Sequence, residues 1–183
     1  METSRSVDQD QFESAVNLAK RSDVVVMVLG EESILSGEAH CRTHLNLPGA
    51  QEILIDEVAK TGKPIILVIL AGRPLTLEAV IDKVDSVLYA WHPGTMGGAA
   101  IADILLGKVA PSGKLPVTFP RNVGKVPIYY AQKHSGKPAT SESYIHMNDI
   151  PVRAAQTSLG MTSAHLDTHF SPLFPFGYGL TYG

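Results

Sequence analysis

The polar loop at residues 31–47 carries the side chains of this chain that are best suited to chemistry. It follows a run of apolar, mostly β-branched residues and contains Glu31, Glu32 and Glu38 together with Arg42. A positioned carboxylate can donate or accept a proton during a reaction. Because α/β folds place reactive groups in loops at the carboxyl ends of strands, Glu38 is the first candidate for a catalytic group.

The residues alone also allow simpler interpretations of this loop. A glutamate in a loop is commonly just solvated, so Glu38 could have no chemical role. Glu31, at the end of the apolar run, is a rival candidate. A structural role is favoured for it, either pairing with Arg42 or capping nearby backbone amides. Glu32 is expected at the surface.

Strands and helices are predicted to alternate around this loop. Short continuous apolar runs predict strands buried on both faces at residues 23–29, 64–70 and 86–91. Helices are predicted at 8–20, at 48–60 with Pro48 in the first position, at 75–81 and at 99–106. Parallel strands joined by crossover helices give an α/β fold, a three-layer α/β/α sandwich with a mostly parallel sheet.

The second half of the chain has a different character. Prolines bracket a short β-prone run at residues 111–120, which predicts an edge strand. Residues 126–170 show no sustained period and predict an irregular wrap, and the aromatic residues of 170–183 are expected to be buried. We therefore expect one domain over residues 1–183, divided into an N-terminal helix (1–22), a core sandwich (23–125) and an irregular wrap with an aromatic tail (126–183).

Composition and charge exclude several classes of protein. The 183 residues are 44% hydrophobic, enough for a sizeable core. A net charge of −3 makes nucleic acid and anionic membrane surfaces poor partners, and no apolar run approaches the ~20 residues of a membrane span. The single cysteine, Cys41, excludes an internal disulfide and is expected to be incidental. No signal peptide is recognised in this chain.

Three further patterns have both a functional and a structural interpretation. The glycine-rich loop 92–98 could bind phosphate, but it lacks the lysine and hydroxyl of a P-loop, so close packing against a neighbouring domain is favoured.

Two histidine pairs with a spacing of four could bind zinc, although surface histidines without a ligand are favoured. These pairs are His40 with His44 and His165 with His169. Trp91, Tyr129 and Tyr130 could stack on sugar rings, whereas Trp91 at a strand end is favoured as a packing residue.

Several motifs, in a fixed order from Asp23 onward, resemble the C-terminal α/β sandwich domain of glycoside hydrolase family 3, the β-glucosidase and β-xylosidase group. The resemblance depends on the set, since each motif alone is weak. The motifs are Leu29-Gly-Glu, Ser36-Gly-Glu-Ala39 with Arg42, Leu47-Pro-Gly-Ala-Gln51, Gly62-Lys-Pro, Ala71-Gly-Arg-Pro74, Trp91-His-Pro-Gly-Thr-Met-Gly-Gly98, Ala102-Asp-Ile-Leu-Leu-Gly107, Pro111-Ser-Gly-Lys-Leu-Pro-Val-Thr-Phe-Pro120 and Pro172-Leu-Phe-Pro-Phe-Gly-Tyr-Gly-Leu-Thr-Tyr182.

The resemblance implies one half of a catalytic site. In this family the glutamate of the Ser-Gly-Glu loop, here Glu38, is the general acid/base of a retaining exo-acting β-glycosidase. From their residue types and positions, Glu31 and Arg42 are expected to be supporting residues. The aspartate nucleophile and most of the sugar-binding site belong to a (β/α) barrel domain, which is not in this chain. The resemblance further implies a carbohydrate substrate, no cofactor, no metal and a periplasmic or secreted enzyme. We expect an exposed, mobile Glu38 and negligible hydrolysis by the isolated domain. The alternative is a flavodoxin-like phosphate- or nucleotide-binding module.

Overall fold

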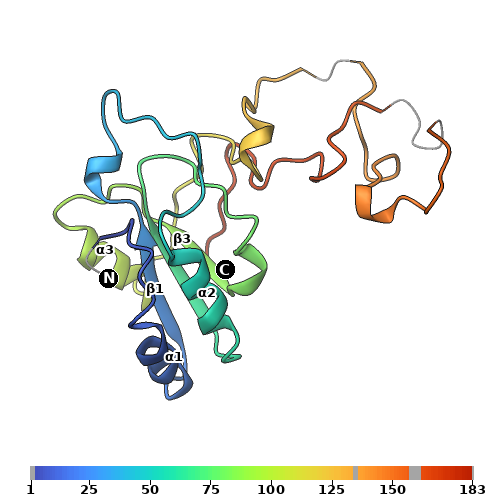
Figure 1. Ribbon diagram of the computed structural model, residues 1–183. Helices are drawn as coiled ribbons and strands as arrows, with labels where there is room; N and C mark the ends of the chain where they lie inside the picture. The colour runs from blue at the N-terminus through green and yellow to red at the C-terminus, as the bar shows by residue number, and fades with distance from the viewer. Residues whose placement is uncertain (1–2, 134–135, 157–161, 183) are drawn as a thin grey trace.

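A parallel sheet forms the centre of the computed structural model, which describes residues 3–133, 136–156 and 162–182 (Figure 1). Its strands are β1 (Val25–Gly30), β2 (Ile65–Leu70) and β3 (Ser86–Tyr89), in the order β1-β2-β3. Both pairs are parallel, so Met27 lies opposite Leu67, which lies opposite Val87. The predicted α/β fold with a parallel sheet is confirmed.

Helices cover both faces of this sheet. They are α1 (Phe12–Lys20), α2 (Gln51–Ala59) and α3 (Gly97–Leu105). α1 and α2 contact each other, and Ala19, Ile55 and Val58 join the core with Leu67 and Ile69 of β2. Figure 1 shows α3 on the other side of the sheet from α2. Successive side chains of a strand point to opposite faces, so the fully buried Val68 of β2 faces that side.

β1 is less buried than its sequence predicts. On the face opposite the core, Val24, Val26 and Val28 are 48%, 47% and 57% exposed, whereas Met27 on the core face is buried. The prediction of strands buried on both faces is therefore wrong for β1, because its valines on the face opposite the core are left largely uncovered. It is correct for most of the central strand β2, where Leu67, Val68 and Ile69 are fully buried.

Two predicted helices need correction. α2 begins at Gln51 rather than Pro48, because Gly49 adopts a left-handed φ of 64° and packs so closely that a Cβ would lie 2.4 Å from the Ser6 carbonyl oxygen. No α-helix forms at residues 75–81, which instead end in a short 3₁₀ turn, Ile81–Lys83. Leu75, Thr76 and Leu77 are all buried, a pattern that a helix with one apolar face does not produce.

The second half of the chain contains no regular sheet among its described residues. Residues 111–120 do not form the predicted edge strand: Phe119 makes an isolated antiparallel bridge with Phe174. The described part of residues 126–170 contains only a short 3₁₀ turn, Met147–Asp149, and an isolated bridge, so the irregular extension is confirmed. The prediction that the aromatic tail is buried is wrong in part, since Phe176 and Tyr182 are about half exposed. In the described ranges, no helix is long and apolar enough to span a membrane.

Candidate active site

Segments that follow all three strands meet at the carboxyl edge of the sheet. Glu31 directly follows β1, and its backbone N–H donates to the carbonyl oxygen of Leu70 at 2.8 Å. Gly72 follows β2, where a Cβ would lie 2.4 Å from Nε2 of His92, beyond β3, and 2.8 Å from Oγ of Ser36. This edge is where open α/β sheets place their functional groups.

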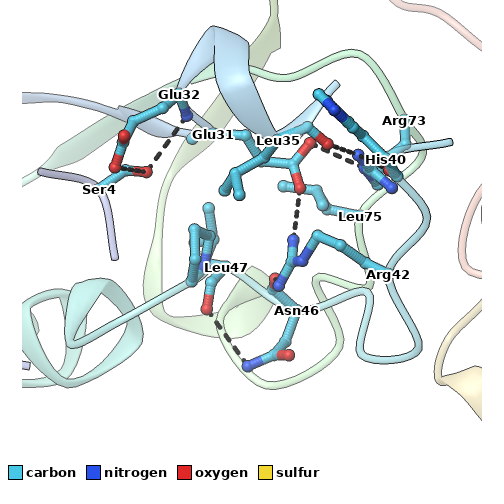
Figure 2. A network of polar contacts seen from close by, with 12 residues as sticks. Ser4, Glu31, Glu32, Leu35, His40, Arg42, Asn46, Leu47, Arg73 and Leu75 are labelled. Atoms are coloured by element: carbon cyan, nitrogen blue, oxygen red, sulfur yellow. Dashed lines mark hydrogen bonds and ion pairs between the residues drawn. The ribbon is translucent and has the colours of Figure 1, made fainter. Parts of the chain in front are cut away.

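A buried ion-pair cluster organises this edge (Figure 2). The Glu31 side chain has no exposed surface and lies between two guanidinium groups. Its Oε1 accepts from Nη1 of Arg42 at 2.5 Å, and its Oε2 accepts from Nε of Arg73 at 3.0 Å. A fully buried carboxylate requires such partners, because removing a charge from water is costly. The Glu31–Arg42 pair expected from the sequence is present.

Sequence reasoning did not single out Arg73 for this cluster. Arg73 lies 42 residues from Glu31, so no local spacing links the two. The available signal was positional: Ala71-Gly-Arg-Pro74 directly follows the second predicted strand, at the same sheet edge as Glu31. An arginine beside a glutamate at neighbouring strand ends can form a charge-assisted hydrogen bond with it.

The two arginines also bind the backbone of the loop. Arg42 donates through Nη2 to the Asn46 carbonyl at 3.1 Å. Nη2 of Arg73 donates to the carbonyls of Leu35 and His40, the latter at 3.2 Å. The cluster therefore ties the loop to the segment that follows β2.

Tyr89, at the end of β3, fixes the backbone of Arg73. Its hydroxyl donates to the Arg73 carbonyl and accepts from the backbone N–H of Leu75 at 3.2 Å. Burial raises the pKa of this hydroxyl, so Tyr89 remains a donor at neutral pH. The Trp91 ring lies 4.7 Å from that of Tyr89 and 5.8 Å from that of Phe119, an arrangement typical of a packing residue.

The three glutamates of the loop have distinct environments. Glu31 is buried in the cluster. Glu32 turns toward the N-terminal segment, where it accepts from Ser4 and Arg5, and the Arg5 hydrogen bond lowers its pKa. Glu38 is exposed and makes no hydrogen bond or ion pair with any described residue. Of the three, Glu38 alone is exposed and without a side-chain partner among the described residues.

The other candidate residues do not gather into a site. His40 and His44 are exposed, and the described residues contain no group of three or more His, Cys, Asp or Glu that could hold a metal ion. His165 is exposed, whereas Nδ1 of His169 hydrogen-bonds Oγ of Ser171 at 2.8 Å. Tyr129 and Tyr130 are 57% and 74% exposed, and the Tyr130 ring stacks on Phe176 in the tail.

The glycine-rich loop is packed closely at the start of α3. A Cβ on Gly97, the first residue of this helix, would lie 2.6 Å from the ring of Pro93. The glycine is therefore explained by the proline packed against the first turn. The phosphate-binding alternative gains no support from this arrangement.

Known proteins similar to this chain are glycoside-cleaving enzymes by their names. The Glycosyl hydrolase family 3 C-terminal domain matches residues 2–182. The periplasmic beta-glucosidase of Salmonella typhimurium is 42% identical over 95% of this chain and 21% of its own length. A beta-xylosidase of Formosa agariphila is 35% identical over 97% of this chain and 22% of its own length.

A solved structure shares the fold. The beta-glucosidase of Listeria innocua in complex with gluconolactone superposes with a TM-score of 0.84 at 33% identity, covering 98% of this chain and 23% of that chain. The chain thus spans about a fifth of the length of the relatives it matches.

Proposed function

Because the chain belongs to glycosyl hydrolase family 3, as its C-terminal domain, we propose that it supplies the general acid/base of a retaining, exo-acting β-glucosidase. The substrate is a terminal β-linked sugar. The names of the relatives favour glucose over xylose, since the Salmonella protein, which has the highest identity of the three at 42%, and the Listeria protein are beta-glucosidases, whereas the Formosa protein, at 35% identity, is a beta-xylosidase. A periplasmic or extracellular location is proposed from the Salmonella relative.

The observation that carries this proposal is the contrast between Glu38 and Glu31. A proton donor must reach the leaving oxygen of the substrate, which a carboxylate enclosed by two arginines cannot do. Glu38 is exposed at the carboxyl edge of the sheet and has no side-chain partner among the described residues. It is therefore the better candidate for a group that works on a sugar held outside this domain.

Retaining hydrolysis requires two carboxyl groups about 5–5.5 Å apart. In our proposal an aspartate of a (β/α) barrel domain of the longer enzyme attacks the anomeric carbon. The glycosidic C–O bond breaks as Glu38 gives its proton to the leaving oxygen. Glu38, now a carboxylate, takes a proton from the water that attacks the same carbon and releases the aspartate. The chain on its own lacks the nucleophile, so we propose that it hydrolyses no glycoside alone.

Leaving-group dependence tests the role of Glu38 in the longer enzyme. A dinitrophenolate leaves without protonation, whereas the sugar leaving group of cellobiose needs a proton. We expect Glu38→Ala to lower kcat/KM for cellobiose about 10²–10⁴-fold and to change kcat/KM for dinitrophenyl β-glucoside far less. Azide added to the Glu38→Ala variant should raise its turnover of dinitrophenyl β-glucoside and yield a glycosyl azide, because azide attacks without a general base.

The neighbouring glutamate provides a matched control. Glu32→Ala removes a carboxylate six residues away that is paired with Arg5, and it should leave the ratio of the two kcat/KM values unchanged. Equal losses on both substrates in Glu38→Ala would contradict the proposed role.

A further inference from the structure

We propose that Arg73 is a positioning residue that holds Glu38 in its working direction by clamping both sides of the loop that carries it. The proposal rests on the acid/base role of Glu38. It starts from the contacts of one guanidinium group. Nε of Arg73 donates to Glu31, and Nη2 donates to the backbone carbonyls of Leu35 and His40. These carbonyls lie three residues before and two residues after Glu38.

The clamp closes a tight turn with Glu38 at its tip. The His40 N–H donates to the Gly37 carbonyl at 3.1 Å. Gly37 has a φ of 148° and Ala39 a φ of 63°, and a left-handed conformation costs a residue other than glycine roughly 1–2 kcal/mol. Such a conformation persists only where surrounding contacts impose it. The Arg73 contacts on both sides of the turn are contacts of this kind.

The position of Arg73 is itself fixed by residues at the ends of the strands. Its backbone carbonyl accepts a hydrogen bond from the Tyr89 hydroxyl. Its side chain is held by the buried Glu31 carboxylate, as Figure 2 shows. Arg42 holds the opposite oxygen of Glu31. The clamp is therefore built on the ends of β1, β2 and β3, while the Glu38 side chain at the tip stays free. This arrangement supports the backbone and leaves the carboxyl group available for a substrate.

Only an arginine can make these three contacts together. A guanidinium presents five N–H donors in a rigid, planar fork, whereas a lysine ammonium is a compact charge at the end of a flexible stem. Lysine at position 73 would keep the charge beside Glu31 but would not reach both carbonyls. Arg73→Lys therefore separates the loss of the clamp from the loss of a buried charge.

The test measures Arg73→Lys and Arg73→Ala in the longer enzyme with cellobiose and dinitrophenyl β-glucoside. A small misplacement of a catalytic group can cost about 10²-fold in rate. We expect kcat/KM for cellobiose to fall by about 10- to 100-fold and kcat/KM for the activated substrate to fall far less. The ratio of the two values does not depend on how much of a preparation is folded, so a destabilised variant still gives an answer.

Two controls distinguish positioning from general stability. Arg121 also joins a carboxylate, that of Glu78, to a backbone carbonyl, that of Ser171, but it makes no hydrogen bond or ion pair with the described residues of the loop. Arg121→Lys should leave the ratio unchanged. In a Glu38→Ala background, Arg73→Lys should change the ratio no further, because residues that act through one group are not additive.

The outcomes separate the two proposals. If Glu38→Ala shows the leaving-group dependence and Arg73→Lys lowers both rates equally or not at all, the clamp is refuted and the role of Glu38 stands. If Glu38→Ala shows no such dependence, the proposed function fails and the clamp fails with it. A ratio that changes as much in Arg121→Lys as in Arg73→Lys also refutes the clamp.

Discussion

Replacing Glu31 by glutamine should strongly destabilise the domain. The substitution keeps the size of the side chain, which has no exposed surface, but removes the charge shared by Arg42 and Arg73. One guanidinium keeps an acceptor oxygen, and the other faces an amide NH₂ group, donor against donor. The two cations then lie close together without a counter-ion.

The size of the effect follows from burial. Removing one partner of a buried ion pair costs about 3–5 kcal/mol. The arginine side chains are 18% and 17% exposed, so water offsets part of the loss. We therefore expect the lower end, about 3 kcal/mol. With a urea m-value of about 2 kcal/mol/M, the unfolding midpoint should fall by about 1.5 M at constant m.

Urea unfolding of the 183-residue chain at pH 7, followed by circular dichroism, measures this shift. Glu32→Gln is the matched control, because the adjacent glutamate pairs with an Arg5 side chain that is 55% exposed, and its midpoint should change little. Equal small shifts in the two variants would refute the view that the Glu31 cluster holds this edge of the sheet together.

Two further variants test the packing around the loop. The Gln51 side chain is 2% exposed, accepts a hydrogen bond from the Gly30 N–H and donates to the Gly30 and Pro48 carbonyls. Gln51→Leu should therefore lower the free energy of unfolding in urea by about 3 kcal/mol. A loss no larger than that of Gln9→Leu, at an exposed position, would contradict this expectation. Burial raises the pKa of Glu52 above its usual 4.5, so ionisation disfavours the folded state as pH rises through that pKa. Glu52→Gln should therefore stabilise the chain at pH 7 and lose this gain below about pH 4.5, and a gain that persists in acid would be inconsistent with the burial effect.

The sequence predicted the positions of the three strands well, because a continuous apolar run is a local signal. The run Ile65–Leu70 is continuously apolar, and its central residues are fully buried. The prediction failed for Val26 and Val28, because apolar residues do not reveal whether another element covers each face of the strand. It also failed at Leu75 and Leu77, which pack into the core from an irregular segment rather than from a helix.

Sequence patterns did not predict the pairings between segments that are distant along the chain. Phe119 meets Phe174, 55 residues further along the chain, and the prolines around it prevent a longer ladder. Arg73 reaches the loop at residues 35 and 40 only because β1 and β2 are neighbours in the sheet.

Residue types and short spacings were enough to predict the parallel α/β fold, the loop that carries the candidate chemistry and the ordered motifs of the family. Which glutamate is enclosed and which is exposed follows from contacts between segments that are distant along the chain. That outcome depends on Arg73, which follows β2 and contacts Glu31 and the loop, and on Tyr89 of β3, whose hydroxyl holds the Arg73 backbone. Electrostatic pairing acts over a few ångströms in space, whatever the separation along the chain.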